Sequence, residues 1–440
     1  MAALKIEEVP LSKLRENPRN TRTHPSAQIR RIAESIRHFG FTSPIIADHE
    51  YCILAGHARR AGAKALGLRT VPVVVLPELT EAERRVFLLA DNKIGEMAGW
   101  DRSALAVEWS ELSPLLTQAG LDVELTGFEV GEIDSLLGDF IDPEQDPPEQ
   151  LIAVENEAVT SRGDLWCLSE HRLLCGDTRD EADLRAVMGR RRADMIFADP
   201  PYNVRVRSTL GRGKIKHREF VAASGEMSQK QYSRFLATAL GMVAKYSADG
   251  SIHFICTDWR HLREMLDAGE EVYSELKNVI VWTKTNVGQG SFYRSQHELI
   301  FVWKNGHAQH RNNFGLGQHG RTRSNVWTYP GVNTFRSGRL EDLAAHPTTK
   351  PVKLVADAIR DCSKRGDIIL DPFMGSGTTI VAAESIGRRA YGFDLDPLYV
   401  DVSVRRWQAL TKRDALLHGT RKTFDEVAAD RRTAKSKAGA

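Results

Sequence analysis

The chain has 440 residues, more than one typical domain holds, so two or more folded units are expected. Hydrophobic residues make up 42% and charged residues 27%, and no apolar run reaches the ~20 residues that span a bilayer, so no membrane partner is expected. The formal net charge is only +2, so bulk charge does not by itself indicate a nucleic-acid partner. The start lacks the apolar core of a signal peptide and the five cysteines are scattered, which predicts a cytoplasmic location.

The first predicted unit covers residues 1–100 and mixes helices with short strands. Apolar residues recur on one face over Ser26–Phe39, which predicts a helix that Ser26 caps and Gly40 ends. Residues 56–60 (GHARR) open a further helix, and residues 80–83 (TEAE) form a capping box for another. Short strands are predicted at residues 44–47, 51–54 and 71–76.

Three further segments flank the second large unit. Residues 101–140 are predicted to form a helical extension, and residues 141–160 an acidic linker whose prolines resist helix and core formation. Residues 416–440 are charged and rich in Ala and Lys, so a flexible tail is expected there.

Residues 161–415 alternate apolar strand-like runs with helical stretches. The helical stretches include residues 228–246 and 352–363. Strands are predicted at residues 172–175, 195–198, 251–256, 278–282, 299–303, 368–370 and 390–393. This alternation predicts an α/β fold with a doubly wound, mostly parallel sheet, beside a small α+β amino-terminal domain.

The strand at residues 195–198 runs directly into Asp199-Pro200-Pro201-Tyr202. A carboxylate, two rigid prolines and an aromatic ring at the carboxyl end of a strand stand where open α/β sheets bind ligands. An ordinary proline turn after a strand is the alternative for this tetrapeptide alone.

A glycine-rich loop follows the strand at residues 368–370. Its glycines, Gly375 and Gly377, allow close approach of a ligand to the backbone, and the helix that begins at Thr378 offers free N–H groups. Asp394 ends the next strand, where an acid can bind ribose hydroxyls. Asp396 is better explained as a helix cap.

Motifs in this order resemble the DNA amino-methyltransferase family with the permuted, β-group arrangement. They are residues 172–177 (RLLCGD), 199–202 (DPPY), 346–351 (HPTTKP) and 373–377 (FMGSG). The resemblance implies a Rossmann-like domain that uses S-adenosyl-L-methionine, double-stranded DNA as the partner and, by analogy only, a homodimer.

The resemblance also implies roles for single residues. Asp199 and the Pro200 carbonyl would accept hydrogen bonds from the exocyclic amine, and Tyr202 would stack on a base flipped out of the duplex. Asp394 would bind the cofactor ribose and Asp177 would lie near its adenine. Further cofactor contacts are implied for Lys350, Asp371, Phe373, Gly375, Gly377 and Thr378. For Asp371, a turn role at the strand end is an equally good interpretation.

The reacting base is predicted to be adenine. Methylation at carbon 5 of cytosine needs a cysteine nucleophile, and none of the five cysteines follows a proline or lies in the acidic-aromatic motif. Asp199 as first residue of the motif favours adenine N6, because related cytosine N4 enzymes more often carry Ser there. Cytosine N4 stays the alternative.

Two segments are predicted to contact DNA. Residues 286–345 lie where the family places its target-recognition region and include Arg321 and Arg323. The stretch after the catalytic motif is basic and is predicted to contact phosphates. Its residues are Arg205, Arg207, Arg212, Lys214 and Lys216. A solvated insertion and a charged surface loop are the respective alternatives.

The amino-terminal unit resembles a ParB-type amino-terminal domain through residues 17–22 (NPRNTR), the helix at Ser26–Phe39 and residues 56–60. In such domains this turn meets nucleotide phosphates, which implies that role for Gly56, His57, Arg59 and Arg60. His57 replaces an acidic residue of the partition proteins, so a docking module without nucleotide is an alternative. The rival for the whole chain is a ParB-like DNA- or nucleotide-binding protein with an inactive methyltransferase half, and methylation of RNA or protein glutamine is a third possibility.

Overall fold

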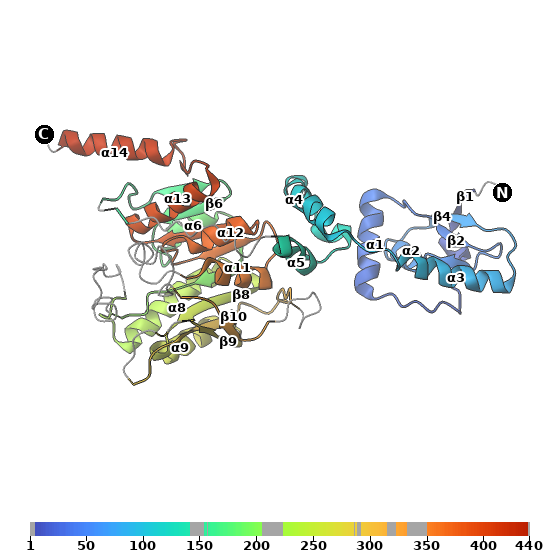
Figure 1. The fold of residues 1–440 in the computed structure, drawn as a ribbon, viewed down its shortest axis with the longest axis horizontal. Coiled ribbons are helices and arrows are strands. Elements are labelled where there is room, and N and C mark those ends of the chain that lie inside the picture. Colours follow the sequence, from blue (N-terminus) through green and yellow to red (C-terminus); the bar gives the residue numbers. More distant parts are fainter. Residues whose placement is uncertain are drawn as a thin grey trace. The chain divides into compact units, whose positions relative to one another are not determined.

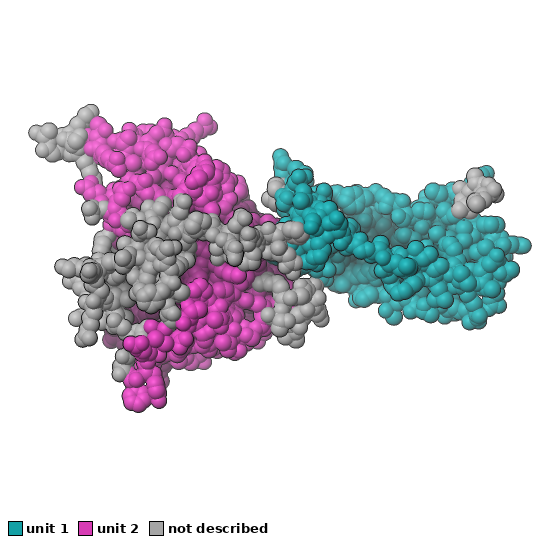
Figure 2. All heavy atoms as spheres, viewed as in Figure 1, with its two compact units in different colours: residues 1–140 teal, residues 141–440 magenta. Residues whose placement is uncertain are grey.

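The computed structural model describes residues 5–140, 154–155, 157–204, 223–285, 287, 292–314, 323–331 and 350–438. The chain divides into two compact units, Met1–Phe140 and Ile141–Ala440 (Figure 2). Among the described residues, none of the helices is both long enough and apolar enough to cross a bilayer.

The first unit begins with a small sheet covered by helices (Figure 1). Its strands are β1 (Ile6–Pro10), β2 (Ile45–Ala47), β3 (Ile53–Ala55) and β4 (Thr70–Val75), in the order β1-β4-β2-β3. The helices are α1 (Ser26–Phe39), α2 (His57–Ala65) and α3 (Glu81–Gly95). Three predicted strands, three predicted helices and the Thr80 capping box are confirmed. Strand β1 was not predicted, and Pro25 rather than Ser26 caps α1, because Ser26 is already helical.

The helical extension is also confirmed. It contains α4 (Arg102–Ala119), a short 3-10 helix (Val123–Thr126) and α5 (Val130–Phe140). Trp109 and Ile133 are buried together in its small core. Arg31 of α1 binds Glu129 at 2.9 Å, so the extension contacts the preceding domain through an ion pair as well as through the chain itself.

The second unit is built on one large sheet (Figure 1). Its strands run in the order β11-β9-β10-β8-β7-β12-β13-β6-β5-β14. Parallel pairing joins β8, β7, β12, β13 and β6, whereas β10 is antiparallel to β8 and β9. The bounds are β5 (Leu165–Leu168), β6 (His171–Cys175), β7 (Ala193–Ala198), β8 (Ser247–Thr257), β9 (Glu275–Thr283), β10 (His297–Lys304), β11 (Val326–Thr328), β12 (Ile368–Asp371), β13 (Arg389–Asp394) and β14 (Leu416–Leu417).

Helices cover both faces of this sheet, as the predicted doubly wound fold requires. Ile196 and Ala198 of β7 face a core formed with α6 (Glu181–Met188), α8 (Gln229–Lys245) and α9 (Leu262–Val272). Their neighbours Met195 and Phe197 face the opposite core. There α11 (Val352–Cys362), α12 (Thr378–Ser385) and α13 (Pro397–Thr411) pack. The seven predicted strands are confirmed, and β5, β11 and β14 were missed because they are short.

The expected flexible tail is wrong. Helix α14 (Phe424–Ala438) buries Phe424, and the Phe424 ring lies 5.1 Å from that of Trp166. Val427 and Ala428 continue the same apolar face at helical spacing. The Ala- and Lys-rich composition concealed this face, because a helix needs only one apolar stripe to pack.

The predicted linker also ends earlier than expected. Val159 and Thr160 are buried, and their backbone N–H groups donate to the two carboxylate oxygens of Asp401 on α13 at 2.6 and 3.0 Å. Satisfying two backbone donors inside the fold fixes this segment to the second unit, so residues 159–160 belong to the folded domain.

Candidate active site

The carboxyl ends of four adjacent parallel strands carry the residues that the motifs single out. Asp199 follows β7, Asp371 ends β12, Asp394 ends β13 and Asp177 follows β6. In the sheet these strands lie side by side in the order β7-β12-β13-β6. Open parallel sheets bind ligands at this edge, so the fold brings the predicted catalytic and cofactor residues to one rim.

Two side chains hold the Asp199 carboxylate in place. The Tyr202 hydroxyl donates to Oδ1 at 2.7 Å, and the Lys350 Nζ donates to Oδ2 at 2.6 Å. Lys350 also lies 3.2 Å from the Tyr202 hydroxyl. Lys350, which was predicted to contact the cofactor, therefore binds Asp199 and Tyr202 rather than the glycine-rich loop.

The proline turn itself is fixed from α8 and from the segment before it. Tyr232 donates from its hydroxyl to the Pro201 carbonyl at 2.9 Å. Asn203, at a positive φ of 51°, accepts from the backbone N–H groups of Gly225 and Met227 and donates to the Met227 carbonyl. Within the described parts of the chain, no hydrogen bond to the carbonyl oxygen of the buried Pro200 is found.

Glu298 completes the cluster and was missed by the sequence analysis. Its Oε2 lies 3.1 Å from the Lys350 Nζ, and its Oε1 accepts from the Nζ of Lys284. The Lys350 and Glu298 side chains are only 5% and 17% exposed, which makes this a largely buried ion-pair network. An acid at the start of the apolar run 299–303 was the available signal, since such strands rarely carry charge without a partner.

The network shifts the pKa of Lys350, Glu298, Asp199 and Tyr202. Burial disfavours the Lys350 ammonium, but Asp199 and Glu298 outweigh burial and raise the pKa of Lys350. Burial also opposes the Glu298 carboxylate, yet Lys350 and Lys284 lower the pKa of Glu298 to about 2. For Asp199, burial together with repulsion from Glu298 exceeds the attraction of Lys350, so the pKa of Asp199 is raised. Burial raises the pKa of Tyr202, whose hydroxyl stays a donor.

The glycine-rich loop after β12 is held mainly by backbone and by α13. Gly377 has φ of 82° and a Cβ there would lie 2.8–3.0 Å from Ser403, so only glycine fits. Ser403 in turn donates to the Gly375 carbonyl at 2.9 Å. Thr378 begins α12 directly after Gly377, and Phe373 lies half-buried with its ring 6.1 Å from that of Phe235.

Asp371 and Asp394 hold this loop from the strand ends. Asp371 accepts from the Phe373 N–H at 2.9 Å and from the Thr379 hydroxyl at 2.6 Å, which matches the turn role. Asp394 accepts from the N–H groups of Gly375 and Asp396, each at 2.8 Å. Burial raises the pKa of Asp371 and of Asp394 to about 7 each, and no Lys or Arg in the described residues forms an ion pair with either.

Asp177 lies next to Asp394 across the strand ends, since the Gly176 N–H donates to the Asp394 carbonyl at 2.9 Å. Its carboxylate accepts from Arg179 through both oxygens. Burial opposes the charged form, but Arg179 outweighs burial and lowers the pKa of Asp177.

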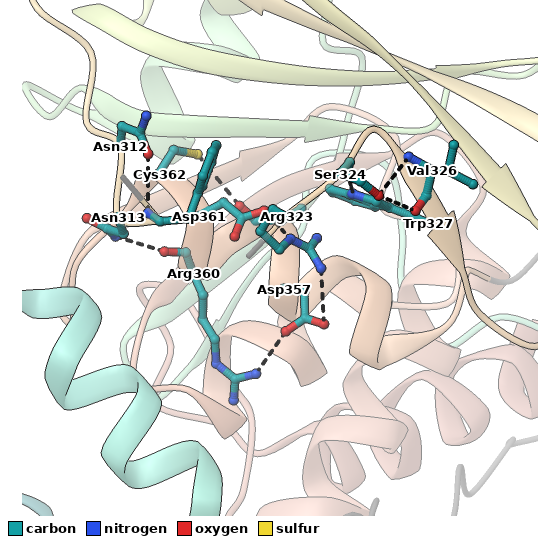
Figure 3. Close-up of polar contacts among 12 residues, drawn as sticks. Asn312, Asn313, Arg323, Ser324, Val326, Trp327, Asp357, Arg360, Asp361 and Cys362 are labelled. Carbon is teal, nitrogen blue, oxygen red and sulfur yellow. Dashed lines mark hydrogen bonds and ion pairs between the residues drawn. The ribbon is translucent and has the colours of Figure 1, made fainter. Parts of the chain in front are cut away.

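Most of the predicted DNA contacts lie outside the described residues. These are Arg205, Arg207, Arg212, Lys214, Lys216 and Arg321. Arg323 is described, and its guanidinium points into the protein toward α11 (Figure 3). It binds Asp361 at 3.1 Å and the Tyr329 hydroxyl at 3.2 Å, and its side chain is 17% exposed. The prediction that Arg323 contacts DNA therefore has to be revised, because its charge is already compensated inside the fold.

In the first unit, the residues at the start of α2 lie together as predicted. Gly56 caps α2 with φ of 98°, and a Cβ there would lie 3.0 Å from the Arg59 guanidinium. Among the described residues, the His57 Nε2 and the Nε atoms of Arg59 and Arg60 are buried without a hydrogen-bond partner. Burial, together with nearby positive charge, lowers the pKa of His57.

The doubly wound sheet and its acid-bearing edge define an α/β protein with a ligand site at the strand ends. Residues 193–405 match the family described as DNA methylase. The type II methyltransferase M2.DpnII of Streptococcus pneumoniae is 31% identical over 233 residues, covering 49% of this chain and 82% of the relative. M2.LlaDCHI of Lactococcus lactis subsp. cremoris is 29% identical over 229 residues, covering 48% and 81%. The chain belongs to the DNA methylase family.

The comparisons also cover the first unit and the fold. Residues 2–92 match the ParB N-terminal domain, which confirms the ParB-like prediction. Residues 103–162 match the ParB-methyltransferase HTH domain, a range that includes the predicted helical extension and linker. A putative DNA modification methylase from Thermus thermophilus, solved with S-adenosyl-L-methionine, is 20% identical, with a TM-score of 0.39 over 57% of this chain and 99% of that one.

Proposed function

We propose that this chain methylates the exocyclic N6 amine of adenine at a specific site in double-stranded DNA. The observation that carries the proposal is the fixed pair of acceptors on the turn after β7, the Asp199 carboxylate and the Pro200 carbonyl. The amine of a nucleobase is a weak nucleophile because its lone pair is delocalised into the ring. Two acceptors placed on its hydrogens favour a tetrahedral nitrogen and aim its lone pair at the methyl group.

The base must leave the duplex to reach this turn, which costs a few kcal/mol of unstacking. The Tyr202 ring lies beside the two acceptors and offers a stacking face, while its hydroxyl stays bound to Asp199 at 2.7 Å. The Asp199 carboxylate can accept a hydrogen bond from the amine of adenine and equally from that of cytosine. Adenine is favoured because related cytosine N4 enzymes more often carry Ser as the first residue of the motif, and cytosine N4 is the alternative outcome.

S-adenosyl-L-methionine supplies the methyl group as a sulfonium. The residues at the neighbouring strand ends fit such a cofactor, because Asp394 is a half-buried carboxylate whose two oxygens each accept one backbone N–H and keep further acceptor capacity. Asp394 would accept from the ribose hydroxyls, and Asp177 would lie on the adenine side. Phe373, Gly375, Gly377 and Thr378 would line the methionine side, where α12 begins.

The test is the methylation state of DNA from a methylation-free bacterial host that expresses the chain. Nucleosides from digested DNA are identified by mass spectrometry, and N6-methyladenine is expected. N4-methylcytosine would keep the mechanism and overturn the choice of base. Neither product, from folded protein that binds the cofactor, would overturn the function.

The Asp199→Ala variant tests the role of the turn. It removes one of the two acceptors, so methylation should fall by about 10³-fold or more, while cofactor affinity stays within a few-fold of wild type because Asp394 and the glycine-rich loop are unchanged. The rate is measured by transfer of a labelled methyl group to DNA and the affinity by calorimetry. Activity within tenfold of wild type would exclude Asp199 as the acceptor.

A second candidate function concerns the first unit. The Nε2 of His57 and the Nε of Arg59, which have no hydrogen-bond partner in the described residues, favour a phosphate group from a nucleotide or from the DNA backbone, whereas Arg60 is already paired with Glu16. Binding of a nucleoside triphosphate and of a short DNA duplex is compared for wild type and Arg59→Ala. Loss of triphosphate binding alone would identify a nucleotide site, loss of duplex binding alone a docking site, and no loss would exclude both.

A further inference from the structure

The buried ion-pair network behind Asp199 contains an acid that the proposed methyl transfer does not use. We propose that Glu298 is a positioning residue for this reaction. It holds Lys350 between two carboxylates, so that Lys350 fixes the Asp199 carboxylate while this carboxylate can still accept a hydrogen bond from the amine of the base. This inference rests on the proposed function and adds to it a residue that touches neither base nor cofactor.

The topology explains why Glu298 reaches the catalytic edge. Strand β10 runs antiparallel to β8, with Leu299 opposite Thr257, so β10 begins where β7 and β8 end. Glu298 is the second residue of β10, and Lys284 directly follows the last residue of β9. Both side chains therefore meet Asp199 and Lys350 at the same rim, although they are distant in sequence.

Each of the three N–H donors of the Lys350 ammonium group has an acceptor nearby. An ammonium group has three donors, and the Lys350 Nζ has three acceptors, at 2.6 Å from Asp199, 3.1 Å from Glu298 and 3.2 Å from Tyr202. Three directions fix the ammonium position more closely than one ion pair would. Tyr202, which accepts from Lys350 and donates to Asp199, closes a ring of contacts that sets the plane of the Asp199 carboxylate.

Glu298 is itself held by two cations, Lys350 at Oε2 and Lys284 at Oε1. Positive and negative groups thus alternate in the order Lys284, Glu298, Lys350, Asp199. Because Lys350 pairs with two carboxylates, it attracts each of them less strongly than it would attract one alone. Without Glu298, Lys350 would pair with Asp199 alone, and Asp199 would then be a weaker acceptor for the amine of the base.

The charge on Asp199 also depends on groups from every neighbouring element. Lys350 precedes α11, Glu298 lies on β10 and Tyr202 lies on the same turn. Tyr232 on α8, Cys256 on β8 and Asp371 at the end of β12 also interact with it. Of the two carboxylates among these groups, Glu298 has the larger effect, and its negative charge raises the pKa of Asp199.

The kinetic test compares Glu298→Gln with Glu298→Asp. We expect Glu298→Gln to lower kcat by about 10- to 100-fold while KM for S-adenosyl-L-methionine stays within about twofold, because the acceptor is misplaced and the cofactor site is not. The acid limb of its kcat–pH profile should move to lower pH, since a negative neighbour of Asp199 is gone. Glu298→Asp keeps the charge and should leave the limb in place.

The matched control is Glu275→Gln, on strand β9, whose exposed carboxylate pairs with Lys277 at 2.9 Å. It should match wild type in rate and pH profile. Equal kcat in Glu298→Gln and wild type would overturn the inference. A lower kcat with an unmoved acid limb would also overturn it, because a merely structural role predicts that result.

A second measurement does not depend on activity. Unfolding by urea is followed for wild type, Glu298→Gln, Lys350→Met and the double variant. Strongly non-additive midpoints are expected, because the two side chains contact each other, and additive midpoints would overturn the pairing. A wild-type chain that methylates no DNA refutes the proposed function, whereas an active wild type that Glu298→Gln matches refutes only the present inference.

Discussion

Two neighbouring turns at the rim of the large sheet are built in opposite ways. After β7, Asp199 is held by Lys350, which lies 151 positions away in the sequence, and through it by Glu298. After β12, Asp371 is held by the Phe373 N–H and the Thr379 hydroxyl, two and eight positions away. The first turn depends on charged side chains that are distant in the sequence as well as on the nearby Tyr202 hydroxyl, whereas the second depends on nearby backbone and hydroxyl groups.

The difference matches what each turn has to bind. Under the proposed function, the Asp199 turn holds a weak nucleophile in one orientation, and an ion-pair network restricts a carboxylate in more directions than a single hydrogen bond. The glycine-rich loop must let a ligand approach the backbone, so bulk is excluded there and the acids Asp371 and Asp394 stay without cations in the described structure. Burial without a cation raises the pKa of each to about 7, which makes the cofactor side of the rim sensitive to pH.

The largest effect is expected from Lys350→Met. This variant leaves Asp199 without its cation and Glu298 with Lys284 as its remaining partner, and removing one partner of a buried ion pair costs roughly 3–5 kcal/mol. Asp199 would bind a proton and lose its role as acceptor, so methylation should fall by about 10²- to 10³-fold, with cofactor affinity nearly unchanged.

The control for Lys350→Met is Lys245→Met, which removes an exposed lysine paired with Glu181 and should cost at most about 1 kcal/mol. Methyl-transfer assays and calorimetry on both variants check the prediction. If Lys350→Met lost cofactor binding as strongly as activity, the Asp199 turn and the glycine-rich loop would not have separate roles in methyl transfer and cofactor binding.

An intermediate effect is expected from Gly377→Ala on the other turn. The methyl group would meet Ser403 at a positive φ, so strain and overpacking together should cost roughly 2–4 kcal/mol of unfolding free energy and weaken cofactor binding about tenfold or more. Gly163→Ala is the matched control, because Gly163 has φ of 90° and open space around it. Thermal unfolding and cofactor titration would contradict the prediction if both variants behaved alike.

The smallest effect concerns pH. Because burial raises the pKa of Asp394 to about 7, the free folded protein holds a proton there between about pH 4 and 7 that the unfolded chain lacks. The stability from this group is therefore present at low pH and lost as the pH rises through 7. Ribose hydroxyls need the charged acceptor, so cofactor affinity should fall up to about tenfold from pH 7 to pH 6.

The Asp394→Asn variant isolates this contribution, because Asp371 still titrates in both proteins. It should bind the cofactor more weakly than wild type at pH 8 and show a flatter pH dependence below pH 7. Calorimetric titrations at several pH values check this. Identical slopes for the two proteins would remove Asp394 from the ribose site.

The features that depend on neighbouring residues could be predicted from the sequence alone. Apolar runs predicted the strands of the large sheet, the glycines at 375 and 377 predicted the loop, and DPPY predicted the acceptor turn, because strand, turn and helix start are local properties. The amphipathic helix at Ser26–Phe39 and the Thr80 capping box followed in the same way. Parallel pairing then followed from the alternation of strands and helices.

Only the tertiary structure decided which distant charges meet. The local sequence does not indicate that Lys350 binds Asp199 rather than the glycine-rich loop, or that Glu298 joins them. It also does not indicate that Arg323 forms an ion pair with Asp361 inside the fold. The burial of Phe424 in the apparent tail belongs to the same category. The physical reason is that ion pairs and core contacts depend on strand order and direction, and here the antiparallel course of β10 brings an acid to the rim where the parallel strands end.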